Sequence, residues 1–454
     1  MKITRIELKG YNQFKDVVID LTYPKGHEKE GKPLDKICII GQSGSGKTTL
    51  LRLIKWFVSL TRDVGKNVRL PVPPENGVKM EVRLFDFNYR MGNTGEYPFF
   101  YFDWDSDIEE LDFFQLLREN FKKINPLLFN FPTEVITGDN GEEKGESDTL
   151  QMLDKVIAVQ VSPYMNKLNL GRSIDFAVGD VNKTLGNILE DIKKHQEQEI
   201  LFNNQIAKAS SPKAASRKKG EFNKWLKQNP NPLALMAEHY LDDLLFYLGL
   251  KVKSDIDENT ISHLGSIQLQ TLAGRYVPGS FWSTGTRHLV ESTVPLYKLK
   301  PQNAVILIDE PDRSLYPDIQ KGIIDTYVNL APGSQFFFAT HSPIIAASFE
   351  PWEIVELKFD DEHKYVYRDL HYEGKNHVDN YKYFPQYLRW DSILERIFEL
   401  EEEGGKKRLK ALEKLAEVDI RIAKLKEQGQ LNTPEGKKLV KEFKVLSQRV
   451  DWEY

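Results

Sequence analysis

The feature that most constrains the fold is a glycine-rich segment at residues 41–48, GQSGSGKT. It has the G-x-x-x-x-G-K-[ST] pattern of a P-loop, in which backbone N–H groups enclose phosphate oxygens. An apolar run at 37–40 precedes the segment, and apolar residues at helical spacing follow it from Leu50 to Phe57. A strand, a glycine loop and a helix in this order aim a helix N-terminus at an anion. The segment therefore predicts nucleotide binding rather than an ordinary glycine turn.

The pattern also assigns roles to side chains within the segment. Lys47 is expected to reach the terminal phosphates, and the Thr48 hydroxyl can hold Mg²⁺. The expected ligands are therefore ATP and Mg²⁺. The nucleotide-binding residues predicted here are Gly41, Gly44, Ser45, Gly46, Lys47, Thr48 and Thr49.

Composition narrows the class of protein. The 454 residues are enough for two to four domains, and 40% apolar with 28% charged residues is typical of soluble globular proteins. A net charge of −5 argues against a uniformly basic surface that coats nucleic acid. The single cysteine, Cys38, excludes a disulfide framework and favours the cytoplasm. The sequence has no run of 18 apolar residues, so we expect no membrane span.

Alternating and apolar runs predict several strands. We expect β-hairpins at 1–22 and 352–370, and single strands at 78–90, 98–102 and 156–161. Two continuous apolar runs, at 304–308 and 335–339, are typical of a parallel sheet that is covered on both faces.

The run at 304–310, AVILIDE, ends in two carboxylates. This is a Walker B pattern, in which Asp309 would hold Mg²⁺ through water and Glu310 would polarise the attacking water. The alternative is a strand that ends in an acidic turn, which the P-loop upstream disfavours. The strand at 335–339 is followed by His341, at the end of the sheet where α/β ligand sites lie. His341 can contact the γ-phosphate or orient the water.

Residues 282–286, WSTGT, precede a predicted helix at 287–299. A serine and a glycine that open a helix make a second phosphate-binding terminus, here with Ser283 and Gly285. Such triplets are common. The position of this one, between the P-loop and the Walker B strand, makes it informative.

Together these motifs resemble the ABC ATPase superfamily, in the order P-loop, signature (282–286), Walker B, D-loop (about 312–316) and switch histidine. The resemblance covers about 1–92 and 265–372. The opening strand and the EPDRSLYP stretch at 310–317 are similar to the soluble branch that contains the chromosome-maintenance (SMC-type) and OLD ATPases. Stand-alone ATPases of this kind occur in anti-phage systems such as Septu, PARIS and retron cassettes.

The resemblance implies an α/β fold, an ABC-type P-loop ATPase head with a mixed or parallel sheet, flanking helices and an antiparallel β-subdomain. The expected domains are a head at 1–92 and 265–372, an insertion with a short helical arm at 93–264, and a C-terminal helical module at 373–454. The resemblance also implies a Q-loop glutamine, for which Gln160 is our candidate.

Some residues depart from the pattern of the branch. Trp282 replaces the usual leucine of the signature, and Thr286 replaces the usual glutamine or glutamate. Tyr316 stands where the branch usually has histidine. None of these departures removes a group that would contact Mg²⁺, water or phosphate.

Head-to-tail pairing of two copies is a further implication of the resemblance. Ser283 and Gly285 of one copy would close over nucleotide held by Lys47 of the other, in a homodimer or a higher homo-oligomer. The tail at 390–454 lacks the carboxylate set of a TOPRIM nuclease. We therefore expect an ATP-hydrolysing sensor or scaffold for a separate nuclease or toxin in anti-phage defence. The alternative is a DNA-repair or chromosome-associated ATPase that acts directly on DNA. The insertion and the signature type disfavour a transporter subunit.

The insertion and the tail leave two alternatives open. We expect helices at 180–207 and 221–250, with a break at 209–220 that forms the tip of the arm. The basic residues near the break either contact a nucleic-acid backbone or belong to a solvated loop, which is favoured. The apolar stripe at 409–425 is expected to pack against the head, with docking to an oligomer or effector as the alternative. The basic residues are Lys208, Lys213, Arg217, Lys218 and Lys219.

Overall fold

A computed structural model of the chain describes residues 1–62, 77–84, 87–93, 101–104, 128–131, 173–175, 194–195, 197–253, 267–369, 385–398 and 405–452. The chain divides into two compact units, Met1–Leu388 and Arg389–Tyr454. Each unit is built around its own packed elements.

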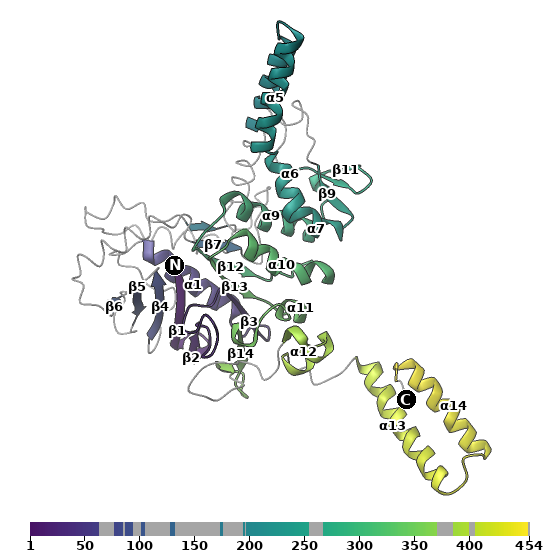
Figure 1. Ribbon diagram of the computed structural model, residues 1–454. Helices are drawn as coiled ribbons and strands as arrows, with labels where there is room; N and C mark the ends of the chain where they lie inside the picture. Colours follow the sequence, from purple (N-terminus) through teal and green to yellow (C-terminus); the bar gives the residue numbers. More distant parts are fainter. Residues whose placement is uncertain are drawn as a thin grey trace. The chain divides into compact units, whose positions relative to one another are not determined.

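The first unit contains one long mixed sheet (Figure 1). In the described residues this sheet has 12 strands, in the order β6-β5-β4-β1-β2-β15-β14-β3-β13-β12-β7-β8. Strands β12 and β13 are buried at every residue, as expected for parallel strands covered on both faces. The parallel half consists of β14 (Ile354–Phe359), β3 (Lys36–Gly41), β13 (Gln335–Ala339), β12 (Val305–Asp309), β7 (Leu128–Phe131) and β8 (Ser173–Asp175).

The other half of the sheet is antiparallel. It contains β6 (Tyr101–Trp104), β5 (Phe87–Asn93), β4 (Gly77–Leu84), β1 (Lys2–Tyr11) and β2 (Phe14–Asp20). Strand β15 (Val366–Asp369) pairs antiparallel with β14 and parallel with β2, so it joins the two halves. The arrangement confirms the predicted α/β fold, with a mixed sheet, flanking helices and an antiparallel β-subdomain.

Some of the strand predictions are confirmed and one is wrong. The hairpins expected at 1–22 and 352–370 are confirmed as β1–β2 and β14–β15. The single strand expected at 78–90 is wrong, because this segment forms the antiparallel pair β4 and β5, with Leu84 opposite Phe87. The sequence between these two residues contains no glycine or proline, so the alternating pattern carries no sign of the reversal.

Helices connect the parallel strands. Helix α1 (Lys47–Arg62) follows β3 and packs against β3, β7, β12 and β13 through an apolar face that includes Leu53, Ile54 and Phe57. Helix α10 (Pro317–Leu330) connects β12 to β13, and the short helix α11 (Pro343–Ala346) follows β13. Among the described residues of this unit, the single-turn 3-10 helices are η3 (Gly279–Phe281), η4 (Pro351–Glu353) and η5 (Pro385–Tyr387).

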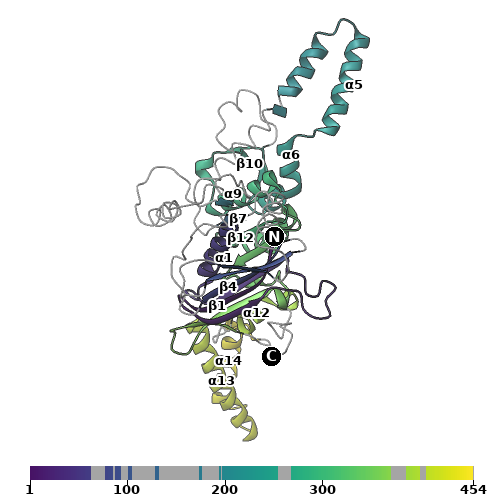
Figure 2. The ribbon, with the colours of Figure 1, turned by 90° about the vertical axis from the view of Figure 1, so that its left-hand side faces the viewer.

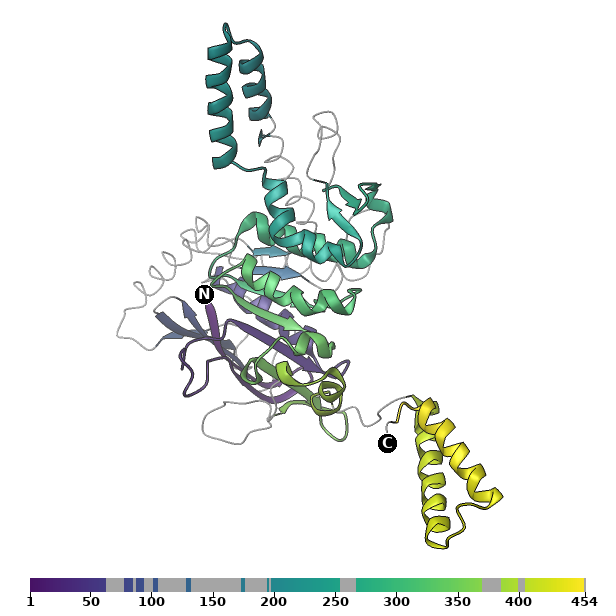
Figure 3. The same ribbon diagram turned by 45° about the vertical axis from the view of Figure 1, so that its right-hand side comes forward.

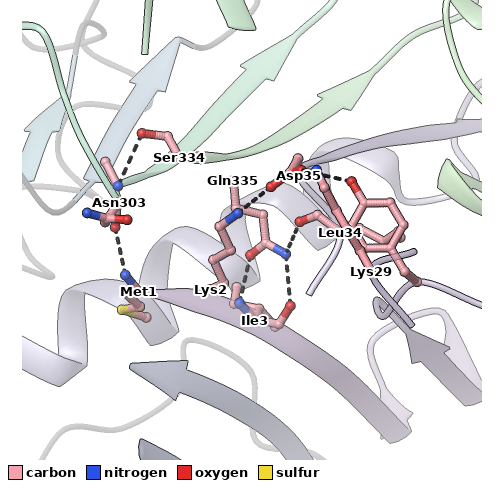
Figure 4. A network of polar contacts seen from close by, with 11 residues as sticks. Met1, Lys2, Ile3, Lys29, Leu34, Asp35, Asn303, Ser334 and Gln335 are labelled. Atoms are coloured by element: carbon pink, nitrogen blue, oxygen red, sulfur yellow. Dashed lines mark hydrogen bonds and ion pairs between the residues drawn. The ribbon is translucent and has the colours of Figure 1, made fainter. Parts of the chain in front are cut away.

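One buried amide links three strand beginnings (Figure 4). The Gln335 Oε1 accepts from Ile3 N at 2.6 Å, and its Nε2 donates to Ile3 O at 2.9 Å and Leu34 O at 3.0 Å. The beginnings of β1 and β13 and the segment just before β3 are therefore held together. Beside this amide, burial alone would raise the pKa of Asp35, but hydrogen bonds from Lys2 and Lys29 lower it to about 2.

Two helices of the insertion lie side by side (Figures 2 and 3). The helical residues 197–207 pack against α5 (Pro212–Gln228), with the ring centroids of Phe202 and Phe222 5.4 Å apart. The break predicted at 209–220 is wrong, because only residues 208–211 interrupt the helices. Ser211 is the N-cap of α5 and Pro212 its first residue, a start signal that is stronger than the loop-like composition.

The helix predicted at 221–250 is also interrupted. After α5 come α6 (Pro232–Met236), the π-helical turn η2 (Ala237–Leu241) and α7 (Asp242–Phe246). A small antiparallel sheet of β9 (Leu250–Val252), β10 (Leu269–Thr271) and β11 (Tyr276–Val277) follows. The predicted strand at 156–161 and the candidate Q-loop residue Gln160 lie outside the described residues.

The second unit contains α12 (Trp390–Arg396) and a hairpin of α13 (Lys406–Glu427) and α14 (Pro434–Arg449). Leu415 and Val418 form a buried core with Leu446 and Val450. The apolar stripe that was expected to pack against the head thus packs against α14, because α14 carries a complementary stripe of its own. None of the described helices has the length and apolar character needed to cross a bilayer.

Candidate functional site

Three adjacent parallel strands end at one edge of the sheet. Ala339 of β13 is in register with Asp309 of β12 on one side and with Ile39 of β3 on the other. The P-loop leaves β3 at Gly41, Glu310 follows β12, and His341 follows β13. The fold therefore brings together, at the carboxyl ends of the strands, three segments that are far apart in the sequence.

The P-loop has a backbone that only glycine adopts readily. Gly41, Gly44 and Gly46 have φ angles of +146°, +83° and +94°. A Cβ atom on Gly46 would lie 2.4 Å from Gln13 Nε2 and 2.6 Å from Phe14 Cζ. Glycine is thus required here both by conformation and by the close approach of the β1–β2 hairpin. The loop leads directly into the N-terminus of α1, a favourable place for an anion.

Lys47, the first residue of α1, is folded into the loop. Its side chain is 7% exposed, and Nζ donates hydrogen bonds of 3.0 Å to Gly41 O and to Gln42 O. Burial lowers the pKa of Lys47 to about 8, against the opposing charges of Asp309 and Glu310. A phosphate oxygen would be a stronger, charge-assisted partner than either carbonyl.

The P-loop and the Walker B strand are joined directly. Thr48 Oγ1 donates a 2.8 Å hydrogen bond to Asp309 Oδ2, across a sequence separation of 261 residues. A hydroxyl beside a carboxylate offers the oxygen ligands that Mg²⁺ prefers. Nearby, the Ser45 hydroxyl is fully buried and has no hydrogen-bond partner among the described residues. An unsatisfied hydroxyl within a P-loop suits a bound phosphate, so these residues fit an ATP·Mg²⁺ complex.

Glu310 is held in a left-handed conformation, with φ +51°. Its N–H donates to Ala339 O at 2.8 Å, and its carbonyl accepts from Arg313 N at 3.0 Å. Burial raises the pKa of Glu310, and the charges of Asp309 and Asp312 raise it further. A raised pKa makes the carboxylate a better proton acceptor.

His341 is exposed at the end of β13. Loss of water on the inner side of its ring lowers its pKa, and the charge of Lys47 lowers it further. The imidazole is therefore neutral at pH 7 and can act as donor or acceptor.

A chain of side-chain hydrogen bonds fixes the loop after β12. Thr340 Oγ1 donates to Asp312 Oδ1 and accepts from Ser342 N at 2.9 Å. Ser342 Oγ donates to Gln320 Oε1 at 2.6 Å, and Gln320 Nε2 donates to Leu315 O at 2.9 Å. The chain thereby links the D-loop, α10 and the switch loop. Sequence reasoning missed Thr340, Gln320 and Ser342. A serine before a proline is a helix-start signal that could have marked the last of them.

The signature turn contacts the D-loop. Ser283 is the N-cap of α9 (Thr284–Leu299) and accepts from Thr286 N at 3.0 Å. A Cβ atom on Gly285 would lie 2.3 Å from Ser314 O, so glycine allows the close packing of the two segments. Ser283 and Gly285 take no part in the hydrogen bonds around Lys47. The P-loop, Walker B and switch residues thus come together, while the buried Gly285 packs against the D-loop and the exposed Ser283 bonds within its own turn.

Two family models match this chain. One is described as "AAA domain" and matches residues 5–229, which include the P-loop. The other, "AAA domain, putative AbiEii toxin, Type IV TA system", matches residues 169–347, which include the signature, the Walker B strand and His341. Parts of the chain are thus similar to AAA domains, with each match covering less than half of its length. Together the two matches include the segments that meet at the sheet edge. No curated protein matches the chain.

Solved structures that match the chain include SMC heads. The SmcHead bound to the C-winged helix domain of ScpA is 17% identical, with 81% of this chain and 97% of that one covered and a TM-score of 0.39. The SMC head domain from Thermotoga maritima is 13% identical, with 81% and 98% covered and a TM-score of 0.38. A Smc head with an extended coiled coil from Pyrococcus furiosus is 14% identical, with 81% and 96% covered and a TM-score of 0.38. Likeness at this level carries no information on function.

Proposed function

We propose that the protein binds ATP with Mg²⁺ and hydrolyses it. The observation that carries this proposal is the hydrogen bond between Thr48 and Asp309, which joins the P-loop to the Walker B strand. Glu310 follows directly, at the sheet edge that also carries His341. A phosphate-binding loop, a pair of metal ligands and a base are the parts that phosphoryl transfer to water needs.

Each residue has a distinct task in this proposal. The P-loop amides and Lys47 hold the phosphates, and Thr48 and Asp309 hold Mg²⁺, which neutralises phosphate charge when bound. Glu310 accepts a proton from the attacking water, helped by its raised pKa. His341, neutral at pH 7, donates to the γ-phosphate or orients the water. Gln160 remains the proposed Q-loop residue.

The signature residues point to a second copy of the chain. Ser283 and Gly285 lie at a helix N-terminus but outside the hydrogen bonds around Lys47. We propose that they contact nucleotide held by another copy, in a homodimer or a larger homo-oligomer. Nucleotide that binds the closed pair more tightly than the open one would then drive association.

We further propose that this ATPase acts in the cytoplasm as a sensor or scaffold for a separate nuclease or toxin in anti-phage defence. Support comes from the matched family model, whose name refers to a putative toxin of a toxin–antitoxin system. Among the described residues, no group of three or more His, Cys, Asp or Glu side chains forms a further metal centre. The effector chemistry is therefore assigned to a partner protein.

Steady-state ATPase assays test the catalytic assignment. Glu310→Gln should keep ATP binding and reduce turnover by about 100-fold or more, because it removes the proton acceptor. Lys47→Ala should abolish binding as well as turnover. Lys321→Gln, a substitution on the exposed side of α10, serves as the control and should leave both unchanged. Full activity of the Glu310→Gln variant would refute the role of this carboxylate.

Phage plating tests the biological assignment. The reading frame and its neighbours, expressed together in a sensitive host, should reduce plaque formation, and Lys47→Ala should remove the protection. Protection that survives Lys47→Ala would contradict a role for the nucleotide site, and no protection by the intact cassette would contradict the defence role itself.

A further inference from the structure

Helix α5 carries a concentration of positive charge that the nucleotide site does not use. Its sequence, PKAASRKKGEFNKWLKQ, contains six basic residues and one acidic residue, a balance of six minus one. The whole chain has a net charge of −5. The positive charge of α5 is therefore a local feature, and local basic surfaces attract polyanions irrespective of the net charge of a protein.

Four of these basic residues share one face of the helix. Positions 213, 217, 224 and 227 follow the spacing i, i+4, i+11 and i+14, which places them in one stripe along a helix of 3.6 residues per turn. The stripe is about 21 Å long, from the rise of 1.5 Å per residue. We call it the α5 stripe. Its residues are Lys213, Arg217, Lys224 and Lys227.

The aromatic residues of α5 lie on the opposite face. Phe222 and Trp225 contact Phe202 of the neighbouring helix, with ring centroids 5.4 Å and 5.5 Å apart, and Trp225 also lies 4.9 Å from His195. These contacts fix the rotation of α5 within the hairpin. The α5 stripe therefore faces away from the neighbouring helix, into solvent.

Among the described residues, most of the positive charges of the α5 stripe have no ion pair within the chain. Glu221 lies 3.7 Å from Arg217 and 2.9 Å from Lys218, and both contacts are within α5. Lys213, Lys224 and Lys227 are exposed and have no acidic partner among the described residues. Their charges are thus available to an external anion.

We propose that the α5 stripe binds the phosphate backbone of duplex DNA. A DNA strand presents a phosphate about every 3.4 Å along the axis, so about six phosphates lie within the length of the stripe. Gly220 sits on the same face between Arg217 and Lys224, and nothing lies within 4 Å of the position of its Cβ. The centre of the stripe is therefore open to the close approach of a backbone.

The chemistry of this face favours nucleic acid over an acidic protein. Ser216, Asn223, Gln228 and the acidic Glu221 are exposed beside the stripe, and no aromatic or aliphatic side chain lies among them. Protein interfaces depend on buried aromatic or aliphatic anchors, whereas phosphate contacts need only cations and small polar groups. Contacts of this kind do not read bases, so the binding is independent of sequence. It does not rest on the proposed ATPase activity.

The test is a salt-dependent DNA titration of the full chain. The probe is a fluorescein-labelled duplex of about 30 base pairs, followed by anisotropy between low and moderate salt. The first variant neutralises the stripe while keeping helix-forming side chains: K213Q, R217Q, K224Q and K227Q. The matched control removes four exposed charges from elsewhere in the first unit: K9Q, K25Q, K32Q and R275Q.

The wild type should bind, and neutralising the stripe should weaken binding about tenfold or more at low salt and reduce the slope of log K against log salt by about 3. The control should behave like the wild type, and far-UV circular dichroism should show that both variants remain helical. Three results would overturn the proposal: no binding by the wild type, equal losses in both variants, or displacement of DNA by polyglutamate at an equal concentration of charge. None of these involves ATP, so they are distinct from failure of the nucleotide site.

Discussion

Lys47 is the residue whose charge the fold controls most directly. Its ammonium donates hydrogen bonds to two carbonyl groups of the P-loop, and burial lowers its pKa to about 8. A lysine with a lowered pKa is partly neutral in the free protein at mildly alkaline pH. Phosphates would stabilise the charged form and return the pKa toward its usual value.

ATP binding at pH 8 should therefore be accompanied by proton uptake, since part of the Lys47 population is neutral before binding. ATP affinity should also fall as the pH rises above 8. Calorimetric titrations in two buffers with different ionisation enthalpies measure this uptake. Lys47→Arg is the control, because arginine stays charged and should show no uptake. A wild type that takes up no protons at pH 8 would contradict the buried state of Lys47.

At this scale, the sequence predicted the residues whose role is local. The glycines of the P-loop and the hydroxyl of Thr48 belong to one contiguous pattern, so eight residues are enough to propose a role for them. Gln320 has no such pattern. Its role arises from hydrogen bonds to two other loops, and these contacts exist only after β12, α10 and β13 have come together.

Gln320 connects elements, and its removal should loosen them. Gln320→Leu keeps the shape of the side chain but leaves Ser342 Oγ and Leu315 O without this partner, at a cost of about 1–2 kcal/mol. We expect kcat for ATP hydrolysis to fall while KM changes little, because the D-loop is affected and the P-loop is not. Gln320→Glu, which keeps the acceptor for Ser342, should recover part of the rate.

Hydrogen exchange separates this effect from general instability. Faster exchange should appear in residues 312–316 and 340–342, with the amides of β3 unchanged. A uniform increase across the sheet, or a change in KM alone, would argue against a positioning role for Gln320.

The α13–α14 hairpin gives a second prediction for the elements. Leu446 is 7% exposed in a core of only a few residues, so Leu446→Ala should cost about 2–3 kcal/mol, enough to unfold so small a core. Limited proteolysis of the full chain should then cut within 405–452 while the first unit stays intact. Ile420→Ala, at a position 58% exposed on α13, is the control and should leave the cleavage pattern unchanged. Equal resistance of both variants would contradict the packing described for this hairpin.

Element boundaries show where sequence patterns are ambiguous. The composition of residues 209–220 is typical of a loop, yet Ser211 and Pro212 start a helix there. Conversely, the alternation at 78–90 continues through a chain reversal without a turn residue. The helix-start signal occupies only two positions, and the chain reversal has no turn residue to mark it. An interpretation based on the composition or alternation of a whole window of residues therefore misses both.

At the scale of the whole molecule, segments of the predicted insertion contribute strands to the main sheet. Strands β6, β7 and β8 lie within the predicted insertion, yet they join the main sheet at its two edges. Strand order depends on pairing between distant segments, which no local pattern encodes. The division into head, insertion and C-terminal module stays a prediction.

We propose that one copy of the chain supplies only part of the nucleotide site. Lys47, Thr48, Asp309 and Glu310 gather at one sheet edge, while Ser283 opens another helix and bonds within its own turn. A second copy would complete the site, and blocking hydrolysis would trap the complete form.

Sedimentation velocity of Glu310→Gln, with and without ATP and Mg²⁺, tests whether two copies share the site. We expect a shift to a larger species with ATP, lost when Lys47→Ala is added to abolish binding. Ser283→Arg, which places a bulky side chain at the proposed contact, should prevent the shift while leaving ATP binding intact. A species of unchanged size with ATP, whether a monomer or a constitutive assembly, would contradict ATP-driven association through these sites.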